Sequence, residues 1–123
     1  MKGLHIISDF LECENNKYLL NHSLFFDNLI QTIKDSEMTV FSHSVHYFGE
    51  PHNSAYTGVI VLGESHVSIH TFPDEKEHYA VTIDVYTCSL TKDNGQGCIR
   101  IYEYLKSLYS PKHIQNENFI RRY

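Results

Sequence analysis

Cysteine, proline and glycine are all scarce in this chain of 123 residues, which holds three, three and six of them. Cys13, Cys88 and Cys98 are too few, and odd in number, for a disulfide framework. We therefore expect reduced thiols and a cytoplasmic location. No stretch rich in proline, glycine or serine divides the chain, and its length is typical of one domain. The sequence thus predicts a single domain over residues 1–123.

Basic residues are also in the minority. Ten Lys and Arg stand against 15 Asp and Glu, for a formal net charge of −5 and a pI near 5.9. Nucleic acids and anionic membranes both need a basic face on their partner, so we expect neither to be bound. No apolar run is long enough to span a membrane, and the first residues lack the apolar core of a signal peptide.

The pattern of hydrophobic residues predicts strands, two helices and one clear loop. The expected strands are Leu4 to Phe10, Met38 to Phe48, Thr57 to Leu62, His66 to Phe72, Tyr79 to Thr87 and His113 to Ile120. The expected helices are Lys17 to Asp35 and a segment after Gly95 and Gly97 that ends before Pro111, and the loop is Glu50 to Ser54. This order predicts an α+β two-layer sandwich, with helices on one face of a mainly antiparallel sheet. A second copy of the chain is the simplest cover for the other face.

Polar residues occupy every second position in two of the expected strands. Because side chains alternate along a strand, His66, Ser68 and His70 share one face of the sheet. The strand from Tyr79 in the same way places Asp84 and Cys88 together. This face therefore resembles the lining of a polar site.

Several interpretations of this polar face remain open on the pattern alone. It can be a solvated sheet face, which antiparallel sheets commonly have. It can be a metal site, but His66 and His70 stand ~13 Å apart on a strand, so a histidine such as His43 or His46 would have to complete it. Cys88 with His70 can form a nucleophilic pair, or Cys88 can be an inert core residue.

Two motifs resemble a known family. The run from Glu64 to Asp74 reads ESHVSIHTFPD, and the run from Ile83 to Cys88 reads IDVYTC. Together they resemble the prokaryotic S-adenosylmethionine decarboxylase proenzyme, a pyruvoyl-dependent enzyme, and the likeness extends more loosely over almost the whole chain. The resemblance implies an enzyme that makes decarboxylated S-adenosylmethionine for spermidine biosynthesis.

The resemblance also implies that the chain cuts itself between Glu64 and Ser65. The Ser65 hydroxyl would attack the Glu64 carbonyl, and elimination from the resulting ester would leave a pyruvoyl group at residue 65. His70 takes the acid–base role in this processing by resemblance. The pieces 1–64 and 65–123 would stay together as one protomer of a homodimer, with each active site at the subunit interface.

The expected cofactor is this covalent pyruvoyl group, with no metal and no pyridoxal phosphate. Its ketone would form a Schiff base with the substrate amine and accept the electrons released with carbon dioxide. By resemblance, Cys88 then protonates the carbanion.

The resemblance assigns substrate binding to Phe48, Thr57, Phe72 and Asp74. The family has tryptophan and glutamate at the positions of Phe72 and Asp74, and serine at the position of Thr57. Because these departures touch the pocket but not the cleavage residues, arginine or ornithine is the alternative substrate. A non-catalytic regulatory paralogue is the third hypothesis.

Overall fold

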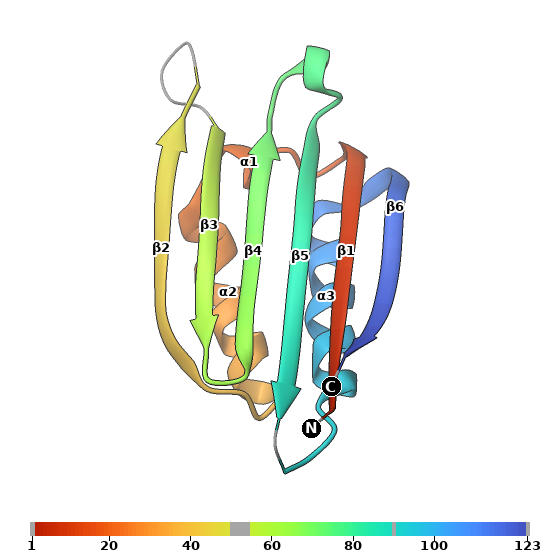
Figure 1. The fold of residues 1–123 in the computed structure, drawn as a ribbon. Helices are drawn as coiled ribbons and strands as arrows, with labels where there is room; N and C mark the ends of the chain where they lie inside the picture. Colours follow the sequence, from red (N-terminus) through yellow and green to blue (C-terminus); the bar gives the residue numbers. More distant parts are fainter. Residues whose placement is uncertain (1, 50–54, 90, 123) are drawn as a thin grey trace.

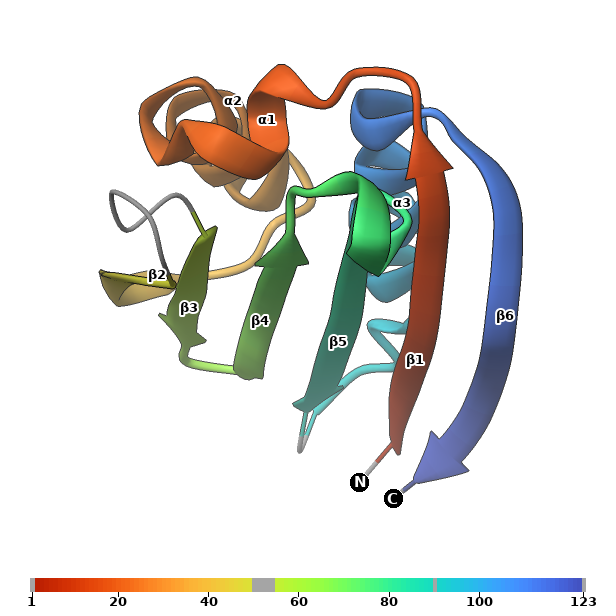
Figure 2. The same cartoon turned by 90° about the horizontal axis from the view of Figure 1, so that it is seen from above.

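Six strands form one sheet, and helices cover one of its faces (Figures 1 and 2). This computed structural model describes residues 2–49, 55–89 and 91–122. The strand order is β2-β3-β4-β5-β1-β6, and every neighbouring pair is antiparallel. The strands are β1 (Lys2–Cys13), β2 (Val40–Phe48), β3 (Ala55–Leu62), β4 (Ser65–Phe72), β5 (Ala80–Ser89) and β6 (Pro111–Arg122). The chain therefore has the expected α+β sandwich.

The helices are α1 (Lys17–Leu20), α2 (His22–Asp35) and α3 (Gly95–Tyr109), with a 3₁₀ turn, η1, at Glu75–Glu77. In Figure 1, α2 and α3 lie behind the sheet, and Figure 2 shows the opposite face uncovered. The single helix expected from Lys17 to Asp35 is divided at Asn21. Asn21 has an extended backbone (φ −130°), and its side chain accepts a hydrogen bond from the Ser23 N–H, which caps α2.

The core lies between the sheet and the helices. Along β4, Val67, Ile69 and Thr71 are buried, and the residues between them are half-buried. β1 and β5 alternate in the same way, so the opposite face of these three strands carries most of their polar residues. We call this helix-free side of the sheet the open face. The helix side holds a continuous apolar cluster, which includes Leu4, Ile6, Phe10, Leu29, Ile33, Val85, Ile101, Tyr102 and Leu105.

The strand boundaries differ slightly from the expected ones. β2 begins at Val40, and a bulge separates its pairing at Val40 from that at Ser42. The last strand runs from Pro111 to Arg122, longer than expected, and begins with proline because an edge strand tolerates a missing N–H there. The loop expected at residues 50–54 lies outside the described residues. Within the part of the chain that is described, every helix is too short or too polar to cross a bilayer.

Candidate active site

The turn between β3 and β4 holds the bond at which cleavage is expected. Gly63 and Glu64 form this turn, and two hydrogen bonds anchor it to Thr39: Gly63 N–H donates to the Thr39 carbonyl (2.9 Å), and Thr39 N–H donates to Glu64 Oε1 (2.7 Å). Ser65 follows with φ 151°. Positive φ is strained for a residue with a Cβ. The Glu64–Ser65 bond therefore lies in an anchored turn with a strained residue on one side.

Cys88 lies directly beside this bond. Its N–H donates a 2.8 Å hydrogen bond to the Glu64 carbonyl oxygen, while Ser65 pairs with Thr87 on the same strand. Gly3 is the cross-strand partner of Cys88, and a Cβ at Gly3 would lie 2.9 Å from the Cys88 Cβ. Glycine at this position leaves room for the Cys88 Cβ, and Cys88 is a free, half-buried cysteine.

A chain of hydrogen bonds begins at the Ser65 hydroxyl. Ser65 Oγ lies 3.1 Å from His66 Nδ1, and His66 Nε2 lies 3.2 Å from Asp84 Oδ1. The same carboxylate oxygen lies 2.8 Å from His5 Nε2, and the Arg122 guanidinium lies 3.3 Å from His5 Nδ1. The sequence pattern placed His66 and Asp84 on this face but missed His5 and Arg122. These two come from opposite ends of the chain, and only the pairing of β1 with β5 and β6 brings them in.

The cluster also brings together three side chains of the kinds that bind metal ions. The ligand atoms of His5, His66 and Asp84 all lie within 4.8 Å of one another. It differs from the metal site considered above, because His66 and His70 are separated along β4 and His43 packs against α2. Since the three side chains already satisfy one another as donors and acceptor, we interpret the cluster as a hydrogen-bonded network.

A second group of expected site residues gathers around His70. His70 Nδ1 lies 2.8 Å from Thr57 Oγ1, and the Phe48 ring stacks on the imidazole at 4.6 Å. Phe72, the last residue of β4, has its ring centroid 4.7 Å from that of His70. Burial lowers the pKa of His70 below its ordinary value of 6.5. Thr57 and His70 line a shallow cavity of about 270 Å³ that extends to Asp84.

The two groups lie at opposite ends of β4. Ser65 and His70 are five residues apart, or ~16 Å at ~3.3 Å per residue, which is far beyond hydrogen-bond reach. Asp74 lies beyond the His70 end, where one carboxylate oxygen accepts the Glu77 N–H (2.8 Å) and caps η1. Within one chain, the predicted processing histidine therefore does not reach the predicted cleavage site.

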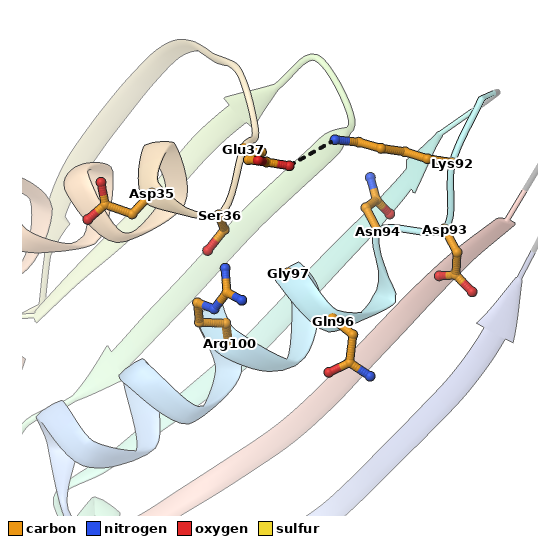
Figure 3. A pocket seen from close by; sticks show the side chains of 9 residues that line it. All are labelled: Asp35, Ser36, Glu37, Lys92, Asp93, Asn94, Gln96, Gly97 and Arg100. Carbon is orange, nitrogen blue, oxygen red and sulfur yellow. Dashed lines mark ion pairs between the residues drawn. The ribbon is translucent and has the colours of Figure 1, made fainter.

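A pocket lies on the helix side of the sheet, between the end of α2 and the start of α3 (Figure 3). It encloses about 420 Å³, and an ion pair between Lys92 and Glu37 (3.5 Å) joins the loop before α3 to the turn after α2. Asn94, which lines this pocket and is buried, donates from Nδ2 to the Cys88 carbonyl (3.1 Å). Asn94 thus fixes the backbone of Cys88, whose N–H contacts the Glu64 carbonyl.

Comparisons with known proteins identify the family of this chain. Residues 4–122 match the family described as S-adenosylmethionine decarboxylase. The S-adenosylmethionine decarboxylase proenzyme of Hydrogenobaculum sp. (strain Y04AAS1) is 36% identical over 120 residues, which cover 97% of this chain and 81% of that protein. The protein of the same name from Persephonella marina is 35% identical over 116 residues, covering 94% and 78%.

A solved structure gives the same result for the fold. The crystal structure of the adenosylmethionine decarboxylase from Aquifex aeolicus VF5 superposes with a TM-score of 0.73 at 31% identity, and the match covers 98% of this chain and 88% of that one. The sequence match, the relatives and the shared fold all span nearly the whole chain. This protein belongs to the S-adenosylmethionine decarboxylase family.

Proposed function

We propose that the protein is a self-processing, pyruvoyl-dependent decarboxylase that converts S-adenosylmethionine to decarboxylated S-adenosylmethionine for spermidine biosynthesis. The names of its relatives support the substrate and the proenzyme state. One observation carries the proposal: the Glu64 carbonyl is held by the Cys88 N–H at 2.8 Å, next to a strained Ser65. This geometry suits an attack of the Ser65 hydroxyl on its own preceding carbonyl.

The geometry of the turn supports the first step of self-cleavage. As Ser65 Oγ bonds to the Glu64 carbonyl carbon, negative charge develops on the carbonyl oxygen, where the Cys88 N–H stabilises it. Cleavage of the C–N bond gives an ester and releases backbone strain of about 1–3 kcal/mol. Elimination then frees the Glu64 carboxylate and leaves a dehydroalanine, whose hydrolysis releases ammonia and gives the pyruvoyl group. The pieces 1–64 and 65–123 remain joined because β3 and β4 stay paired.

Cys88 is well placed to protonate carbon during decarboxylation. The pyruvoyl ketone supplies the electron sink that ordinary side chains lack. Gly3 leaves space for the Cys88 Cβ, and Asn94 holds the Cys88 backbone beside residue 65. Burial, followed by a hydrogen bond with Cys88, raises the pKa of Tyr86. Tyr86 therefore stays a neutral hydroxyl next to the thiol at physiological pH.

A homodimer formed through the open face would complete each active site. Such dimers have two-fold symmetry, so each chain presents the same patch to the other. An axis crossing β4 near Ser68, midway between Ser65 and His70, would place the partner's His70 against Ser65. The partner's Thr57 would follow, because it is held to His70. This arrangement accounts for a polar, aromatic sheet face that a single chain leaves uncovered.

The aromatic cluster around His70 favours S-adenosylmethionine over a basic amino acid. Phe48, His70 and Phe72 offer ring faces to a flat adenine and a cationic sulfonium. The Thr57 hydroxyl and the Asp74 carboxylate complete the proposed substrate-binding set, Asp74 for the ribose hydroxyls. Arginine and ornithine carry no aromatic base, so they would use less of this ring surface. The free thiols suit a cytoplasmic location.

Intact mass after denaturation tests the processing, and carbon dioxide release tests the substrate. We expect two pieces, 1–64 and 65–123, with a pyruvoyl group on the second, and label released from carboxyl-labelled S-adenosylmethionine. Ser65→Ala should give one inactive chain, while Ser107→Ala, an exposed serine on α3, should behave as the wild type. An unbroken wild-type chain would refute self-processing, and release from arginine or ornithine alone would refute the substrate.

A further inference from the structure

His66 lies beside Ser65, and none of the steps proposed above involves it. It is the side chain whose ring nitrogen contacts the Ser65 hydroxyl, at 3.1 Å. Building on the proposed self-cleavage, we propose that His66 is the general base of its first step, and that Asp84 and His5 are positioning residues for it. Ser65, His66 and Asp84 then form a nucleophile–base–carboxylate series, a constellation known for activating serine hydroxyls.

The hydrogen-bond directions in this cluster follow from chemistry. An ionised carboxylate only accepts, so the Nε2 atoms of both His66 and His5 must carry hydrogen where they meet Asp84 Oδ1. Neutral His66 then has its lone pair on Nδ1, which faces Ser65 Oγ. His5 fits the same assignment, because its Nδ1 accepts from Arg122, which can only donate. Every member thus has one consistent role, and His66 is held in the tautomer that a base requires.

The first step balances with these groups alone. The Ser65 Oγ proton passes to His66 Nδ1 as Oγ bonds to the Glu64 carbonyl carbon, and the resulting imidazolium is stabilised by the Asp84 carboxylate. The Cys88 N–H supports the oxyanion. The C–N bond then breaks, and the same proton passes from His66 to the departing Ser65 nitrogen. The product is an ester with a free amine, and no outside reactant is consumed.

This assignment gives the two histidines of β4 different tasks. His66 works within its own chain, next to Ser65. His70 is ~16 Å from Ser65 in the same chain and is occupied by Thr57. The partner's His70 is therefore left for the later step, in which elimination opens the ester by removing a proton from the residue 65 Cα.

Hydroxylamine distinguishes the two tasks because it cleaves esters but leaves amides intact at neutral pH. We expect purified His66→Ala to accumulate as an uncut chain that resists hydroxylamine, with spontaneous cleavage slowed roughly 10²–10⁴-fold. His70→Ala should also be uncut, but hydroxylamine should split it at the ester between residues 64 and 65. Added imidazole should partly restore cleavage to His66→Ala, which also shows that this variant is folded. Asp84→Asn should also slow cleavage, as His66→Ala does, because it removes the charge that stabilises the imidazolium.

The control histidine is His113, exposed on β6, and His113→Ala should cleave at the wild-type rate. The proposal is overturned if His66→Ala cleaves as fast as wild type or accumulates a hydroxylamine-sensitive ester. It is also overturned if a chelator stops wild-type cleavage and added zinc restores it, because the cluster would then be a metal centre. If His66→Ala does not fold, His66→Gln takes its place in the same assay. A wild-type chain that stays intact instead refutes the self-cleavage on which this inference rests.

Discussion

The separation of Ser65 from His70 predicts that two inactive variants restore each other when they share a dimer. A Ser65→Ala chain keeps His70, and a His70→Ala chain keeps Ser65. If His70 acts across the interface, one of the two sites in a mixed dimer is complete, and it cuts the His70→Ala chain. Random pairing of equal amounts places about half of the chains in mixed dimers. About half of the His70→Ala chains should therefore be cut.

The assay is co-expression of the two variants with tags of different length, followed by a denaturing gel and intact mass. Each variant expressed alone should give a single uncut band. The physical reason is distance, because ~16 Å along β4 is about five times a hydrogen-bond length. No cutting in the mixture, with mixed dimers present by mass, would show that His70 does not act across the interface. Cutting of His70→Ala expressed alone would show that His70 is not needed.

Three further predictions concern Gly3, the three cysteines and His70. Gly3→Ala places a Cβ 2.9 Å from the Cβ of Cys88. We expect the free energy of unfolding, measured in urea, to fall by about 1–3 kcal/mol and the turnover to fall with it. Unchanged turnover would contradict the tight contact. Burial raises the pKa of Cys98 to about 11 and that of Cys13 to about 12. At pH 8 the thiolate of Cys98 should therefore be about 100-fold scarcer than that of an ordinary thiol. Mass mapping after treatment with iodoacetamide should find Cys88 modified first. Burial lowers the pKa of His70, so NMR should give this histidine a pKa below 6.5. The folded protein should lose stability as the pH falls from 6.5 toward the lowered pKa of His70, because the unfolded chain binds the proton first. His70→Gln should remove the contribution of His70 to this pH dependence.

Much of the fold was predictable because it rests on local pattern. Alternation in β4 placed Val67 and Ile69 inward and the histidines outward, and the structure agrees. The helix boundary at Asn21 was missed, since the apolar spacing continues through it and only the side-chain cap on Ser23 shows where one helix ends.

The candidate site divides in the same way. The motif around Glu64 and Ser65, with Cys88 downstream, is local enough for a family resemblance to identify from sequence. Spacing along the chain gave no indication that Cys88 donates its N–H to the Glu64 carbonyl, because that contact depends on the register of β4 against β5.

Side-chain alternation and short motifs are properties of neighbouring residues. The two-layer architecture, the polar face of the sheet and the residues of the family motif could therefore be predicted from the order of amino acids. Which polar residues meet across the sheet depends on how the strands pair. The pairing of strands joins His5 and Arg122, from the two ends of the chain, to Asp84 and His66. The physical reason is that a strand holds its own residues ~3.3 Å apart per step, whereas antiparallel pairing brings distant segments into hydrogen-bond contact.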